Sequence, residues 1–180
     1  MKQSRLYWTS LSGIFLALLI ISAQLTIPLP FIPLTLQTLV LGLIASILPL
    51  SYSLKTIGSY LLLGALGLPV FANAKGGLGV FVSVTGGYLV GFLVYVLVVA
   101  VLLKRNRSLL NLSFSNLLGA FLQLVCGSLG MMFVSQITFK QAFLLGTVPF
   151  ILPGIVKIVL VVLLVKAFDS YSSKVSRQNS

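Results

Sequence analysis

The chain has 180 residues, of which 58% are hydrophobic and only 7% are charged, and its mean hydropathy is +1.16. This composition excludes a soluble domain, because too few charges are present to cover a water-exposed surface. We therefore expect an all-α integral membrane protein, with residues 1–180 forming a single domain. The net charge of +11 would indicate nucleic acid binding in a soluble protein. We expect no nucleic acid partner here, because the cations are distributed as in a membrane topology.

Six apolar segments predict six transmembrane helices, which is the fold class we expect for the chain. They cover about residues 9–25, 36–50, 54–68, 85–103, 117–137 and 150–168. The connections are short, so the length leaves no room for a soluble domain. Helices are expected because a spanning segment must satisfy its backbone hydrogen bonds internally.

The first segment carries two small residues, Gly13 and Ala17, four positions apart. This spacing places both on one helix face, where small side chains let another helix approach closely. We expect close packing with another helix at this face, either from this chain or from a partner protein.

A proline-rich stretch follows the first segment. Pro28, Pro30 and Pro33 cannot continue a helix and favour an extended or polyproline II backbone. The stretch is otherwise apolar, with Phe31 at its centre, so it should not extend freely into water. We predict that it lies over the membrane domain as a lid or a re-entrant plug, covered by protein.

Several residues near the mouths of the spans are candidates for ligand contact, each with a structural alternative. Gln37 either satisfies N–H groups at a helix start or lines a cavity. Asn73 is either solvated in its Gly-rich loop or contacts the ligand. Thr85 and Gly86 open the fourth span, where glycine lets a ligand or a helix come close. Tyr88 is either an interfacial anchor or, beside that glycine, a ligand contact.

Lys157 is the most informative residue, because it lies inside the last apolar segment. At about 1.5 Å per residue it is roughly 16 Å from Phe168, near the middle of a bilayer if the segment spans. A charge there costs about 2.5–3.5 kcal/mol and needs a partner or a wet cavity. The only acidic residue, Asp169, lies at the opposite end of the same helix. Lys157 therefore either binds a ligand carboxylate or extends toward the outer interface.

The cations predict the orientation of the six spans. Of the 12 Lys and Arg residues, one side collects nine: Lys2, Arg5, Lys55, Lys104, Arg105, Arg107, Lys166, Lys174 and Arg177. The other side has only Lys75 and Lys140. The positive-inside rule then places both termini in the cytoplasm, and anionic membrane lipids are expected partners of the basic side.

The residue inventory argues against catalysis. The chain has no histidine, one cysteine and one carboxylate, so neither a metal site nor an acid–base or nucleophilic arrangement can be assembled. We expect no enzyme, no metal and no cofactor. No ATPase motif and no intramembrane carboxylate are present either, which indicates a binding subunit that obtains its energy from partners.

Three stretches resemble the BioY family, the biotin substrate-binding (S) components of energy-coupling-factor (ECF) transporters. They are residues 27–38, residues 67–92 and residues 149–157, in the family order and spacing. The resemblance implies a six-helix S component of an ABC-type importer. It also implies that the proline loop gates the pocket, that helix one faces a transmembrane coupling (T) subunit with two ATPase subunits, and that biotin binds against helices four and six.

One departure from the family pattern concerns the ligand. Gly154 stands where the family has an aspartate three residues ahead of the lysine. An aspartate accepts hydrogen bonds from ureido N–H groups well, so its loss favours a ligand with a carboxylate tail and an apolar head, such as lipoate. We therefore expect capture of biotin, or of lipoate or another carboxylated vitamin, in a bacterial plasma membrane. The alternative of another class is a non-transport membrane scaffold subunit.

Overall fold

The computed structural model describes residues 5–178, and this range is almost entirely helical, which confirms the all-α expectation. Seven α-helices lie within it: α1 (Arg5–Gln24), α2 (Gln37–Ile47), α3 (Leu50–Ala65), α4 (Gly86–Arg105), α5 (Leu109–Ser135), α6 (Phe139–Gly146) and α7 (Val148–Gln178). Between them lie a short hairpin, β1 (Thr26–Ile27) and β2 (Leu34–Thr35), and two 3-10 turns, η1 (Ala72–Ala74) and η2 (Leu78–Val80).

The structure describes seven α-helices in this range, and α6 lies outside the six predicted spans. A capping box starts it: Thr138 Oγ1 accepts from the Gln141 N–H at 3.3 Å, and Gln141 Oε1 accepts from the Thr138 N–H at 3.0 Å. The helix has only eight residues and stops at Gly146, so that one residue, Thr147, separates it from α7. It occupies a stretch that the hydropathy pattern assigned to a loop.

Four of the helices, α1, α4, α5 and α7, are long and apolar enough to cross a membrane. With 11 and 16 residues, α2 and α3 are shorter than the roughly 20 residues that a full span needs. Among the described residues, four helices rather than the expected six are therefore long enough for a complete span.

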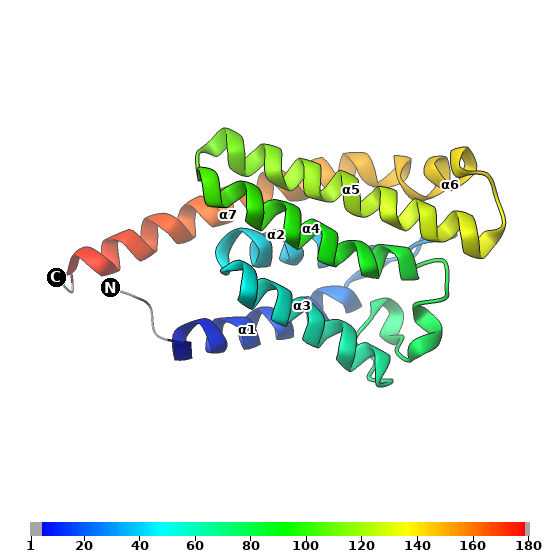
Figure 1. Ribbon diagram of the computed structural model, residues 1–180, viewed down its shortest axis with the longest axis horizontal. Coiled ribbons are helices and arrows are strands. Elements are labelled where there is room, and N and C mark those ends of the chain that lie inside the picture. The colour runs from blue at the N-terminus through cyan, green and yellow to red at the C-terminus, as the bar shows by residue number, and fades with distance from the viewer. Residues whose placement is uncertain (1–4, 179–180) are drawn as a thin grey trace.

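Helices α4 and α5 run side by side and pack against each other (Figure 1). Glycines make this approach possible: a Cβ on Gly87 would lie 2.9 Å from the Gly130 Cα, and one on Gly91 would lie 2.9 Å from the Gln123 carbonyl oxygen. Both contacts are with backbone, so larger residues would force the helices apart. The pair forms a rigid wall onto which α2 and α7 pack.

A buried polar network ties α2 to this wall. The Asn116 side chain is completely buried, accepts a hydrogen bond from the Tyr95 hydroxyl at 2.8 Å and donates one to Ser46 Oγ at 3.1 Å. Each of these polar groups has a partner, as buried polar groups require. A glycine at position 42 leaves room for the network, because a Cβ there would meet the Tyr95 hydroxyl at 3.0 Å.

Helix α1 begins and α7 ends at the same end of the bundle, where the turn between α4 and α5 also lies (Figure 1). At this end Arg107 pairs with Asp169 at 3.3 Å and donates to the Ser46 carbonyl at 2.9 Å. Of the cations that predicted the orientation, Lys2 and the Arg177 side chain lie outside the described residues.

Candidate ligand-binding site

A cavity of about 280 Å³ lies among the hairpin loop, α2, α4, α5 and α7. This volume is near the lower limit for small-molecule pockets, roughly 300–1,000 Å³, and suits a vitamin-sized ligand. Most of the residues predicted from the sequence line it: Pro28, Pro30, Phe31, Pro33, Gln37, Asn73, Thr85, Tyr88, Gly154 and Lys157.

The proline-rich stretch forms one wall of the cavity. Its ends pair as a hairpin, with Thr26 opposite Thr35 and Ile27 opposite Leu34. Pairing at both ends holds the six residues between them as a closed loop. Ile32, in this loop, is buried and packs with Tyr88, so the loop is anchored to α4. The stretch is thus held at the cavity wall by its paired ends and by Ile32.

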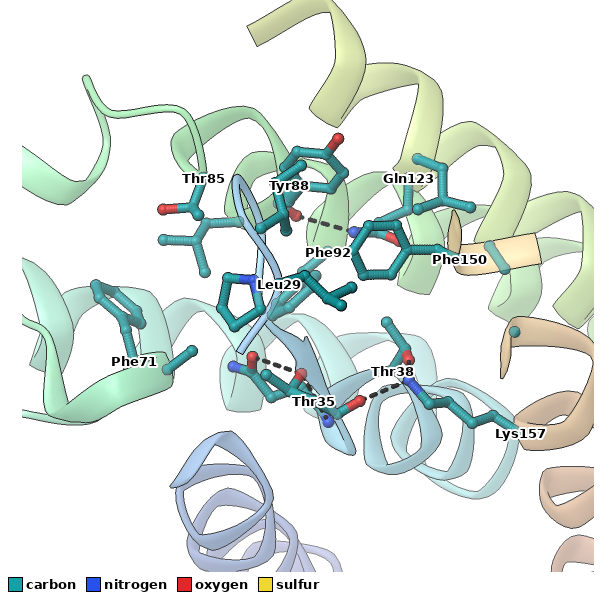
Figure 2. Close-up of a pocket in the computed structure, with 18 of the residues that line it drawn as sticks. Leu29, Thr35, Thr38, Phe71, Thr85, Tyr88, Phe92, Gln123, Phe150 and Lys157 are labelled. Carbon is teal, nitrogen blue, oxygen red and sulfur yellow. Dashed lines mark hydrogen bonds between the residues drawn. The ribbon is translucent and has the colours of Figure 1, made fainter. Parts of the chain in front are cut away.

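Lys157 projects from α7 toward the start of α2 (Figure 2). Its ammonium donates to the Thr35 carbonyl oxygen at 2.5 Å and to Thr38 Oγ1 at 3.0 Å. The side chain is therefore turned into the protein, which is the opposite of extension toward the interface. Both partners are neutral oxygens, and an ammonium has a third N–H donor.

No carboxylate in residues 5–178 neutralises Lys157. The single acidic residue, Asp169, is engaged with Arg107 at the basic end of the bundle. Lys75 also borders the cavity. A positive charge in a largely desolvated cavity, without a counter-charge from the chain, favours an anionic ligand.

The remainder of the cavity wall is mainly apolar and aromatic. Phe71, Phe92 and Phe150 border it, from the loop after α3, from α4 and from α7. Figure 2 shows these rings together with Leu29 of the proline-rich stretch. The Phe71 ring reaches its place because residue 64 is glycine: a Cβ there would lie 2.0 Å from the ring. An apolar ligand body with a charged end matches this distribution.

Tyr88 presents its ring to the cavity, while its hydroxyl is used inside the protein. The hydroxyl donates to the Gly146 carbonyl at 2.9 Å, which joins α4 to the end of α6. A Cβ at residue 127 would lie 2.1 Å from the ring. The ring is thus held at both ends, and its role as an interfacial anchor is disfavoured because it is 7% exposed.

Gln37 fulfils both of the roles considered for it. It borders the cavity, and its amide nitrogen donates to the Tyr60 hydroxyl at 2.5 Å. Its amide oxygen accepts from Thr35 Oγ1 at 3.0 Å, next to the Thr35 carbonyl that receives Lys157. Gln37 therefore supports the lysine site through Thr35.

Asn73 and Thr85 border the mouth of the cavity and have partners of their own. Asn73 Oδ1 accepts from Thr26 Oγ1 at 3.0 Å, with Asn73 itself in a left-handed conformation at φ +59°. The Thr85 hydroxyl lies 3.0 Å from that of Ser83. Asn73 thereby joins the Gly-rich loop to the first strand of the hairpin.

Three predicted residues lie outside the cavity lining. Gly86 is one of them: a Cβ there would lie 1.9 Å from the Phe81 carbonyl oxygen, so the glycine permits a tight backbone turn. Gly13 and Ala17 are exposed on α1, and nothing lies within 4 Å of a Cβ built on Gly13. No helix among the described residues packs closely against that position.

Sequence reasoning missed two polar residues of the cavity, Thr38 and Gln123. Thr38 completes the Lys157 site, and Gln123 lies on α5, 3% exposed. Gln123 carried a signal, because a glutamine inside an apolar segment is an intramembrane polar group and such groups mark functional sites by default.

Comparisons with known proteins agree with this architecture. The sequence profile of the BioY family matches residues 2–174. The chain is 35% identical to the biotin transporter BioY2 of Lactococcus lactis subsp. cremoris, over 89% of each chain. It is 37% identical to the biotin transporter BioY of Thermotoga maritima, over 85% of this chain and 90% of that one.

A solved structure has the same fold. It is the crystal structure of the S-component for biotin from an ECF-type ABC transporter, with a TM-score of 0.88 and 24% sequence identity over 94% of each chain. The fold similarity spans nearly the whole molecule. The profile match and the identity to the two transporters show that the chain belongs to the BioY family.

Proposed function

We propose that this chain captures biotin as the S component of an ECF-type importer. The observation that carries the proposal is the Lys157 ammonium, which lies in a mainly apolar cavity and has only neutral oxygens as partners among the residues that the structure describes. Biotin has a carboxylate on an aliphatic tail and a compact bicyclic head. Membership of a family whose relatives are named biotin transporters supports this ligand over other small carboxylates.

Transport requires an element that opens the cavity, a partner protein that supplies the energy, and a defined orientation of the chain in the membrane. We propose that the loop with Pro28, Pro30 and Pro33 opens the cavity, and that the exposed α1 face with Gly13 and Ala17 contacts a transmembrane coupling subunit, which is joined to two ATPase subunits. The cation-rich end, which includes Arg107, would face the cytoplasm of a bacterial cell, with both termini on that side. Anionic lipids would contact the same end.

Lipoate, or another carboxylated vitamin, is the second candidate ligand. It is favoured by Gly154, which borders the cavity without a side chain and leaves open space at its Cβ position. A ligand with an apolar head needs no acceptor there. Biotin does have ureido N–H groups, which need acceptors elsewhere in the cavity.

Equilibrium binding to the purified full-length protein distinguishes these candidates. Radiolabelled biotin and lipoate would be titrated in detergent or nanodiscs, each competed with the other unlabelled ligand. We expect saturable biotin binding at nanomolar strength. Tighter lipoate binding would favour the second ligand, and binding of neither would favour a membrane scaffold subunit.

A further inference from the structure

The last residue of α1, Gln24, contacts a turn that forms part of the cavity wall. The turn comprises residues 71–75, and four of its five residues border the cavity: Phe71, Ala72, Asn73 and Lys75. Gln24 itself is not among the residues that line the cavity. Its contacts with the turn therefore act on the cavity wall without touching a ligand.

The Gln24 side-chain amide pairs with the backbone of this turn as a neighbouring peptide group would. Its Oε1 accepts from the Ala74 N–H at 3.0 Å, and its Nε2 donates to the Phe71 carbonyl oxygen at 3.2 Å. Nε2 also donates, at 3.4 Å each, to the carbonyl oxygens of Ile20 and Pro69. A backbone donor on one side and carbonyl acceptors on the other determine which amide atom is oxygen and which is nitrogen.

The Ala74 backbone has a conformation that alanine disfavours. Its φ is +53°, and that of the preceding Asn73 is +59°. Asparagine tolerates this left-handed region. The Cβ of alanine approaches the following carbonyl oxygen there, which disfavours the conformation by roughly 5- to 30-fold. Since the Ala74 N–H is the group that Gln24 Oε1 accepts, the amide holds the strained residue directly.

Two other hydrogen bonds hold the turn, and neither involves Ala74. The Phe71 N–H donates to the Lys75 carbonyl at 3.0 Å, which closes the turn on itself. Thr26 Oγ1 donates to Asn73 Oδ1 at 3.0 Å, which joins the turn to the hairpin. Gln24 is therefore the residue that opposes relaxation of Ala74 to an ordinary, negative φ.

We propose that Gln24 is a positioning residue for ligand capture. It holds the turn 71–75 in the conformation that completes this wall of the cavity, and it thereby slows the release of a bound ligand. The physical step is a change of φ at Ala74, which would redirect the chain at Asn73 and Lys75 and open the wall there. The inference rests on the proposed capture of biotin.

The first test measures the release of labelled biotin from the full-length protein. Gln24→Met removes the amide at nearly constant side-chain length. We expect the dissociation rate to rise by about five- to tenfold, which corresponds to the loss of one or two hydrogen bonds. Because Gln24 is exposed, the Tm of the ligand-free protein should stay close to that of the wild type. An unchanged dissociation rate would overturn the inference.

A second substitution, Ala74→Gly, separates positioning of the turn from any other effect of Gln24. Glycine adopts a positive φ without a steric penalty, so the turn should keep its conformation without the amide. The double variant Gln24→Met/Ala74→Gly should therefore release biotin within about threefold of the wild-type rate, because the two changes have similar sizes and opposite signs. Release as fast as from Gln24→Met alone would contradict the proposal.

Hydrogen exchange of the ligand-free protein tests the same step without biotin. The Phe71 amide, whose bond to Lys75 closes the turn, should exchange about fivefold faster in Gln24→Met and recover in the double variant. Unchanged exchange would show that Gln24 does not hold the turn. If the wild type bound no biotin, the proposed function would fail, and the exchange pattern would still report on Gln24.

Gln136→Met is the matched control. Gln136 follows the end of α5, is exposed and left-handed at φ +53°, and donates from its amide to the Phe133 carbonyl at 2.7 Å. It does not border the cavity. This variant should release biotin and exchange the Phe71 amide as the wild type does. Equal effects of the two methionine variants would overturn the assignment of the role to Gln24.

Discussion

Lys157 and Thr35 are 122 positions apart in the chain, and the lysine ammonium donates to the threonine carbonyl at 2.5 Å. This contact joins α7 to the strand that closes the proline-rich hairpin. A ligand carboxylate bound to Lys157, as proposed, would thereby be coupled to the position of the loop. We infer that ligand capture and loop closure share this contact.

Replacement of Lys157 by methionine removes the charge and keeps most of the side-chain volume. We expect biotin affinity to fall by about 100-fold, since a hydrogen bond to a charged group contributes about 1.5–3 kcal/mol and the attraction of the ammonium for the carboxylate is lost as well. Isothermal titration calorimetry of the purified variant measures the change.

Lys140→Met is the matched control, because Lys140 is exposed on α6 and does not border the cavity. It should leave biotin affinity unchanged. If both variants bound biotin equally well, Lys157 would not be the carboxylate site. Thermal unfolding of the ligand-free variants reports whether either one has lost its fold.

Gly154→Asp should raise biotin affinity by about tenfold or more. The site has room, since nothing lies within 4 Å of a Cβ built there, and a carboxylate accepts ureido N–H bonds more strongly than a neutral group does. Lipoate, which has no N–H donor, should gain nothing. The measurement is competition between the two ligands in the same preparation.

Gly154→Asn separates charge from shape in this experiment. The amide is similar in size and neutral, so its gain in biotin affinity should be smaller than that of the aspartate. An unchanged biotin affinity in Gly154→Asp would show that the missing carboxylate does not limit recognition.

Gly127→Ala should destabilise the protein, because its Cβ would lie 2.1 Å from the Tyr88 ring. The ring cannot retreat freely, since its hydroxyl is bonded to the Gly146 carbonyl. Overpacking of this kind costs about 1–3 kcal/mol, partly offset by about 1 kcal/mol of helix propensity. Thermal unfolding should show a lower Tm and a weaker stabilisation by biotin.

Gly58→Ala makes the same change on α3, where nothing lies within 4 Å of the added Cβ. This variant should keep or slightly raise the Tm because of the gain in helix propensity. Equal Tm values in the two alanine variants would mean that the Tyr88 ring adapts without cost.

Gly13→Leu tests the proposed contact of α1 with a coupling subunit. The position is exposed and open, so the chain should fold and bind biotin within about twofold of the wild type. A large side chain on a face of small residues should prevent close helix packing. Co-purification with the coupling and ATPase subunits should therefore be lost.

Gly58→Leu is the corresponding control on another open helix surface. It should co-purify with the partner subunits as the wild type does. If Gly13→Leu also co-purified normally, the α1 face would not be the docking surface.

The membrane class and the approximate helix positions could be predicted from the sequence because they depend on local properties. Apolar runs between polar turns place α1, α2, α3, α4 and α7 within a few residues of their described bounds at most ends. The start of α5 was placed eight residues too late, because residues 109–116 are rich in serine and asparagine. Two of those polar residues, Ser115 and Asn116, are fully buried, so tertiary partners outweigh local polarity there.

The sequence by itself determined that Lys157 lies inside an apolar segment, far from the single acidic residue, and that an apolar proline-rich segment cannot be helical. Only the tertiary structure decided where these features meet: Lys157 on Thr35 and Thr38, Gln123 in the same cavity, and Gly86 against Phe81. The physical reason is that composition and backbone restrictions act along the chain. The partner of a polar side chain, in contrast, depends on how distant helices pack, and no local pattern specifies that.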